Sequence, residues 1–202
     1  EEWQGFGYNK TKMFEICKKK NADYILHIDA DDLIVGDFDF TVKKPLKDAY
    51  YLTTKRHQLN YKCLVIWNNT LDWKFCGVAH TTMRCLSKPN YSHGDELVNP
   101  DIYLHSRDTG ARSIDPKKYF KDGERLQKQF FDTLYFDPDG LNGRSVFYAA
   151  QSYMDAQEWD LALKWYSLYL KFNNTWNEQV FESHTRIARI LTILKKSYEE
   201  IV

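Results

Sequence analysis

The run Asp137-Pro138-Asp139-Gly140 constrains the fold most, because it is a strong break between two parts of different kind. Before it, apolar stretches of strand length alternate with helical patterns, as they do in α/β domains. After it, three segments have the spacing of amphipathic helices: residues 145–157, 159–172 and 178–195. We therefore expect an α/β domain over residues 1–138 and an all-helical region over residues 139–202.

The 202 residues are enough for one domain and a small appendage. Lys and Arg number 28, as do Asp and Glu, and this balance disfavours a nucleic-acid partner, which a basic excess would attract. The mean hydropathy is −0.61, and no apolar run approaches the ~18 residues of a membrane-spanning helix. We expect a cytoplasmic protein without a leader or a transmembrane segment.

The four cysteines stand singly, at Cys17, Cys63, Cys76 and Cys85. Without a CxxC pair, a zinc site of the usual spacing is disfavoured. Free thiols in a reducing compartment are the preferred interpretation, and disulfides are the alternative.

A helix is predicted over residues 9–20, followed by a short, nearly continuous apolar strand over residues 24–28. Such a strand is typical of a sheet that is buried on both faces. Further strands are predicted at residues 49–54, 61–67, 81–86 and 101–105.

A longer helix is predicted from Asp115, as N-cap, and Pro116, at the first helical position, to about residue 135. Gly123 is expected to weaken this helix locally. Its candidate buried residues are Tyr119, Phe120, Leu126, Phe130 and Leu134.

The helical region follows the tetratricopeptide spacing of a small residue, a Tyr, an Ala and an aromatic residue, here Ala150, Tyr153, Ala162 and Tyr166. One such repeat cannot form a free-standing solenoid, because stacked repeats complete each other's cores. We expect it to pack on the α/β part or to begin a longer array. An ordinary helical hairpin is the alternative.

The triplet Asp29-Ala30-Asp31, followed by Asp32, comes directly after the apolar strand. Carboxylates two residues apart at a strand end can share one hard cation, and ligands of open α/β sheets collect at such ends. Mg²⁺ or Mn²⁺ held there would neutralise a diphosphate. The alternative is a loop whose acids only cap turns.

Several stretches around this triplet occur together and in order. Those before or within it are Trp3-x-x-Phe6, Asn9-Lys10-Thr11 and residues 23–32; those after it are residues 71–75, 77–80, 103–105, 110–113, 115–119 and 147–153. Together they resemble a GT-A-fold family 2 glycosyltransferase, in the subgroup with C-terminal tetratricopeptide-like helices. The resemblance implies a GT-A-like mixed sheet flanked by helices, followed by a tetratricopeptide-like hairpin.

The resemblance also implies roles for single residues. Asp29 and Asp31 would bind Mn²⁺ or Mg²⁺ together with His105, and Asp32 would lie by the donor sugar. Asn9 and Lys10, with Asp31, would contact the nucleotide-sugar donor. Trp73 would form part of the wall for a glycan or protein acceptor, unless it is simply a core residue.

The chain departs from the family pattern at the catalytic base. Thr81 and Thr82 follow Val78-Ala79-His80, where family members usually have an acid. His80 is the first candidate for the base, because an imidazole titrates in the right range. Asp95 or Glu96 could supply the acid and contact the acceptor instead.

The resemblance further implies a segment that grips the nucleotide, which nothing before Trp3 supplies: either it precedes this chain in the natural protein, or this piece cannot bind a donor fully. The predicted activity is metal-dependent, inverting sugar transfer to an acceptor hydroxyl. The alternative is a weak or inactive scaffold whose helical tail binds a protein partner or self-associates. Another phosphate-transfer enzyme, such as a nucleotidyltransferase, ranks third, because the sequence has no glycine-rich phosphate loop.

Overall fold

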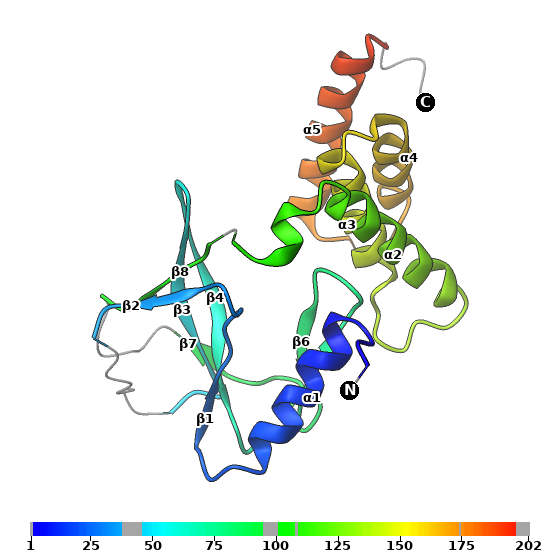
Figure 1. Cartoon of the computed structure of the whole chain (residues 1–202). Coiled ribbons are helices and arrows are strands. Elements are labelled where there is room, and N and C mark those ends of the chain that lie inside the picture. Colours follow the sequence, from blue (N-terminus) through cyan, green and yellow to red (C-terminus); the bar gives the residue numbers. More distant parts are fainter. Residues whose placement is uncertain (1, 38–45, 95–100, 108, 174, 197–202) are drawn as a thin grey trace. The chain divides into compact units, whose positions relative to one another are not determined.

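The computed structural model describes residues 2–37, 46–94, 101–107, 109–173 and 175–196 (Figure 1). Its contacts divide the chain into two compact units. The first consists of Glu1–Gln4, Tyr8–Phe75 and Met83–Ile114, and the second of Gly5–Gly7, Cys76–Thr82 and Asp115–Val202. Each unit is described here by itself. In the described part of the chain, none of the four cysteines is joined in a disulfide.

The first unit is built on a mixed sheet with the strand order β1-β4-β3-β8-β2, in which β7 also pairs with β3 (Figure 1). β3 runs parallel to β8 and β7, and the other neighbours are antiparallel. The strands are β1 (Tyr24–Leu26), β2 (Leu33–Val35), β3 (Ala49–Arg56), β4 (Leu59–Asn68), β7 (His93–Gly94) and β8 (Tyr103–His105).

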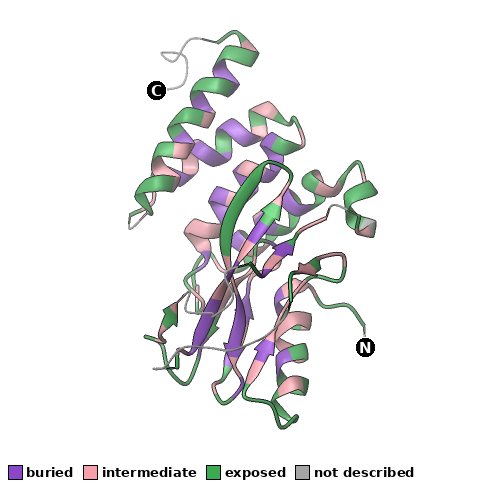
Figure 2. Cartoon of the chain, turned by 90° about the vertical axis from the view of Figure 1, so that its left-hand side faces the viewer, coloured by how far each residue is buried: buried purple, intermediate pink, exposed green. Residues whose placement is uncertain are grey.

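Both faces of the central strands are covered, because successive side chains of a strand point to opposite faces. Ala49 belongs to one core cluster, which includes Phe14 of helix α1 (Phe6–Lys18). The next residue, Tyr50, belongs to another cluster, which includes Leu104 of β8. Figure 2 shows buried residues concentrated along these central strands. The predicted mixed α/β architecture is thereby confirmed for this unit.

Several strand predictions needed correction. β1 ends at Leu26 and only Ile25 in it is buried, because the strand lies at one end of the sheet and not in its middle. β2, β7 and β5 (Trp73–Cys76) were not predicted as strands. β5 pairs with β6 (Thr82–Cys85) in a separate two-stranded sheet.

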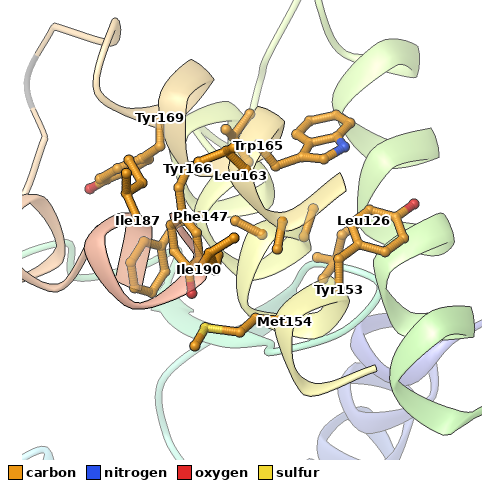
Figure 3. Close-up of a cluster of buried hydrophobic side chains, with 14 of the residues drawn as sticks. Leu126, Phe147, Tyr153, Met154, Leu163, Trp165, Tyr166, Tyr169, Ile187 and Ile190 are labelled. Carbon is orange, nitrogen blue, oxygen red and sulfur yellow. The ribbon is translucent and has the colours of Figure 1, made fainter. Parts of the chain in front are cut away.

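The second unit contains the helices α2 (Lys118–Asp132), α3 (Asn142–Asp155), α4 (Trp159–Tyr169) and α5 (Asn177–Leu194). Their shared core is rich in aromatic side chains, as Figure 3 shows. The residues at the tetratricopeptide spacing are all buried, with exposed fractions of 0–1%: Ala150, Tyr153, Ala162 and Tyr166. These positions therefore supply the contacts between helices.

α2 begins later than predicted, at Lys118, with Lys117 as its N-cap residue. Asp115 instead accepts a hydrogen bond from the Lys117 N–H, at 2.9 Å, in the turn before the helix. Tyr119 and Leu134 are exposed rather than buried, whereas Leu126 and Phe130 lie in the core.

A loop separates α2 from α3 at the predicted break, and the carboxylate of Asp137 accepts the N–H groups of Leu141 and Asn142 at the start of α3. The contacts nevertheless group α2 with the helices after the break, so the second compact unit includes residues on both sides of position 138. No helix in the described ranges has the length and apolarity needed to cross a membrane.

Candidate functional site

The acidic triplet lies in the turn that follows β1, where the N–H of Asp32 donates to the carbonyl of Asp29 at 3.1 Å. Asp31 is held by two contacts from the chain after β8. Its Oδ2 accepts the N–H of Gly110 at 2.9 Å, and its carbonyl accepts Nε of Arg107 at 2.6 Å. The turn is therefore fixed by residues distant in sequence.

Gly110 also determines how closely the chain approaches Asp31. A Cβ at position 110 would lie 3.1 Å from Asp31 Oδ2, which is tighter than ordinary van der Waals contact. The absence of a side chain at Gly110 thus permits the hydrogen bond that orients this carboxylate.

Asp29 is paired with a cation from α1. Lys10 Nζ lies 3.2 Å from Asp29 Oδ1, and the Asp29 side chain is 64% exposed. The same ammonium lies 5.6 Å from the ring centroid of Phe75. Asn9 precedes Lys10 on α1 and is half-buried. The structure thus brings the predicted donor residue Lys10 to the predicted metal ligand Asp29.

The third acid, Asp32, is less exposed. Burial raises the pKa of Asp32, and the carboxylates of Asp29 and Asp31 raise it further. A hydrogen bond with Ser106 acts in the opposite direction, because it stabilises the ionised form. Three carboxylates therefore concentrate negative charge in one turn, as a site for a hard cation requires.

His27 belongs to the same neighbourhood and was not singled out from the sequence. Its ring lies 5.0 Å from that of Phe75 and 5.9 Å from that of Phe14. Burial, together with the charge of Lys10, lowers the pKa of His27 to about 4, while Asp29 opposes the shift. The imidazole is therefore neutral at pH 7.

His105 lies at the end of β8, opposite Leu33 of β2 and Lys55 of β3. Across the described residues, no group of three or more His, Cys, Asp or Glu side chains forms a metal site. A cation held here would thus depend on Asp29 and Asp31 and on oxygens from its ligand, an arrangement common for Mg²⁺. The residues fit that pattern: Asp31 Oδ1 has no hydrogen-bond partner within the described ranges.

Trp73 is a core residue that also lines a cavity. It is 6% exposed, its Nε1 donates to the Asn68 carbonyl at 2.7 Å, and its ring packs on Trp67 and Tyr91. The cavity of about 550 Å³ beside it is lined by α1 and β5 residues, including Tyr8 and Phe75. Contact of Trp73 with an acceptor stays a prediction.

His80 belongs to the second unit, whereas the carboxylates belong to the first. It has a positive φ of 45°, and its ring stacks on Tyr148 with 4.3 Å between centroids. Its carbonyl accepts Nε of Arg144, whose guanidinium also lies over Tyr148. These contacts give His80 a structural role; its role as a base stays a prediction. Asp95 and Glu96 lie outside the described residues.

Sequence reasoning assigned no role of their own to Arg107, Gly110 and His27, although Gly110 and His27 lie in stretches that carry the family resemblance. Arg107 and Gly110 reach Asp31 across 76 and 79 positions, and no local pattern signals such contacts. A comparison with protein-family models finds no matching family, and a search of curated proteins finds no significant match.

Proposed function

We propose that this protein is a metal-dependent glycosyltransferase that transfers a sugar from a nucleoside-diphosphate donor to an acceptor hydroxyl, with inversion. The observation that carries the proposal is the turn at residues 29–32, where Asp31 is oriented by Gly110 and Arg107 and Asp29 is paired with Lys10. The family resemblance of the sequence motifs supports it as well.

In this proposal, Asp29 and Asp31 hold Mn²⁺ or Mg²⁺. When bound, the cation neutralises the charge of the leaving diphosphate. Lys10 can exchange its contact with Asp29 for one with a phosphate oxygen, because the ion pair is partly exposed and correspondingly weak. Asp32 binds the donor sugar, and His105 lies at the end of the neighbouring β8.

The acceptor hydroxyl must lose a proton as it attacks the anomeric carbon. We assign this step to the imidazole of His80, because Thr81 and Thr82 cannot act as bases near pH 7. The bond between the anomeric carbon and the diphosphate oxygen breaks, and the nucleoside diphosphate leaves. The acceptor oxygen bonds to the opposite face of that carbon, so the configuration inverts.

Asp31→Asn tests the proposal, because it keeps the side chain's size and removes its charge. We expect the variant to bind a nucleoside diphosphate in the presence of Mn²⁺ at least about tenfold more weakly than the parent chain. Isothermal titration with a panel of nucleoside diphosphates measures this, and release of sugar from the matching donor reports activity.

Asp132→Asn is the matched control, since Asp132 is exposed in α2 and contacts only Lys128 one turn away among the described residues. Its binding should equal that of the parent chain. If the parent chain binds no nucleoside diphosphate with Mn²⁺, or if Asp31→Asn binds equally well, the proposal is wrong.

A second candidate function is a non-catalytic scaffold whose helical unit binds protein. It is favoured by large side chains that this unit exposes, including Trp176 at 63% and Phe181 at 74%. Aromatic residues on a surface are typical of protein interfaces. If the chain binds a partner protein and this binding is unaffected by metal ions and nucleotides, the scaffold is favoured over the enzyme.

A further inference from the structure

A second polar pocket of about 320 Å³ lies in the first unit, and sequence reasoning did not identify it. Its lining residues are Lys55, His57, Tyr103, His105, Ser106 and Arg107. None of them is acidic, and all can donate a hydrogen bond. We propose that this pocket binds a phosphate group.

The pocket is assembled by the register of two parallel strands. Lys55 of β3 lies opposite His105 of β8, and Thr53 lies opposite Tyr103 two positions earlier. Because side chains alternate along a strand, Lys55, Tyr103 and His105 share one face of the sheet. The N–H of Ser106 donates to the Lys55 carbonyl at 2.9 Å and extends this pairing beyond the end of β8.

The hairpin between β3 and β4 supplies another residue that lines the pocket, His57. His57 stands in the turn with a positive φ of 51°, a conformation that non-glycine residues adopt infrequently. The turn places His57 at the pocket beside the strand ends. Two loops and two strands thus contribute to one concave surface.

The two cations of the pocket are held by uncharged groups. Lys55 Nζ lies 3.6 Å from the ring centroid of Tyr103, so it is held over the aromatic face. Arg107 donates its Nε to the carbonyl of Asp31 and not to a carboxylate. Within the described part of the chain, neither cation forms an ion pair with Asp or Glu.

This combination suits a phosphate group. A guanidinium presents a fork of donors that matches phosphate oxygens, and an ammonium adds a point charge. The imidazoles of His57 and His105 offer further hydrogen bonds, whereas the side chain of Ser106 already forms one with the carboxylate of Asp32 beside the pocket. The volume exceeds that of one phosphate group, so the molecule carrying the group can enter as well.

The phosphate can come from a nucleoside diphosphate or from a phosphorylated acceptor, which share this chemistry. The test uses inorganic phosphate with the full chain in EDTA, so it does not depend on the proposed metal site. Amide chemical shifts in a ¹H–¹⁵N titration report binding at Ser106 and Arg107. We expect saturable shifts there, and a dissociation constant raised at least about fivefold by Lys55→Met.

Lys55→Met retains an apolar stem over Tyr103 and removes the charge, so it should fold normally. The control is Lys62→Met, on the adjacent strand β4 opposite Thr53, which does not line the pocket. It should bind phosphate as the parent chain does. Absence of saturable shifts, or equal weakening by both variants, overturns the proposal.

A second titration distinguishes the sources of the phosphate. If saturating nucleoside diphosphate with Mn²⁺ displaces inorganic phosphate, the pocket serves the donor's diphosphate. If inorganic phosphate still binds, the pocket serves a phosphorylated acceptor. Either result supports a phosphate site. A chain that binds phosphate in EDTA but no nucleoside diphosphate with Mn²⁺ supports the pocket and contradicts the proposed function.

Discussion

At the scale of single residues, charge and hydrogen bonding decide which acids of the first unit are available to a ligand. Asp48 illustrates the opposite case to Asp29. Its Oδ2 accepts bonds from Lys88 Nζ at 2.6 Å, the Ser92 N–H at 2.7 Å and the Ser92 hydroxyl at 2.8 Å. Asp48 is therefore committed to structure, whereas the 64% exposed Asp29 side chain is accessible.

We predict that Asp48 contributes stability that depends on pH. Burial opposes its ionisation, but the bonds from Lys88 and Ser92 outweigh burial and lower the pKa of Asp48. Because the folded pKa is below the unfolded one, the contribution is complete above about pH 4, the ordinary value, and is lost as the pH falls through the folded pKa.

Asp48→Asn measures this contribution. Urea unfolding of the variant near pH 7 should show a loss of about 1–3 kcal/mol, the usual effect of breaking a buried charged hydrogen-bond group. The difference from the parent chain should shrink as the pH is lowered below 4. A difference that stays constant down to pH 2 would contradict this explanation.

At the scale of elements, the packing of helices in the second unit depends on the close approach of α2 to α3. Gly123 in α2 was expected to weaken the helix, yet it is buried against α3. A Cβ at this position would lie 2.8 Å from the ring of Tyr153, whose hydroxyl donates to Gln127. The glycine therefore permits the contact between α2 and α3.

We predict that Gly123→Ala destabilises the protein although Ala favours helix formation. Helix propensity gains about 1 kcal/mol, but overpacking against the buried ring costs about 1–3 kcal/mol. Thermal unfolding should therefore show a lower midpoint. Gly143→Ala in α3 is the control, because its added Cβ would lie 3.9 Å from Phe172, which is ordinary contact. The control should have an unchanged or higher midpoint.

The elements that sequence could predict are those with a strong local pattern. β3, β4 and the helices α3 to α5 lie where alternating or amphipathic spacing indicated. β2 and β7 have three and two residues, and each is a strand only because of a partner far along the chain. No short window of sequence contains that information.

At the scale of the whole molecule, the two compact units differ in what they expose. Both units have large apolar side chains at their surfaces, and the first unit also carries the carboxylate turn and the cationic pocket. Sequence patterns predicted Asp29 and Asp31 because they are only two positions apart in the chain and directly follow a predicted strand. They could not predict the pocket, whose residues come from two separate regions brought together by the register of β3 and β8.

We predict that the exposed aromatic residues of the second unit promote self-association. Analytical ultracentrifugation of the full chain should show an average mass that rises with concentration, because burial of exposed aromatic side chains favours contact between copies. Replacing Trp176 and Phe181 together by Ser should reduce the rise.

The control for association is Leu59→Ser, which removes a side chain of similar exposure, 64%, from the first unit. It should leave the concentration dependence unchanged. A parent chain that stays monomeric, or a double variant that associates as the parent chain does, would exclude this role for Trp176 and Phe181.

The position of β1 has a consequence for how the sheet can grow. β1 is the terminal strand of the sheet in the described part of the chain, with β4 on one side, so its other edge offers backbone groups for pairing. A strand added at this edge would run beside the strand that leads into Asp29 and Asp31. A strand paired there would lie beside the acidic turn without displacing the strands that already hold it.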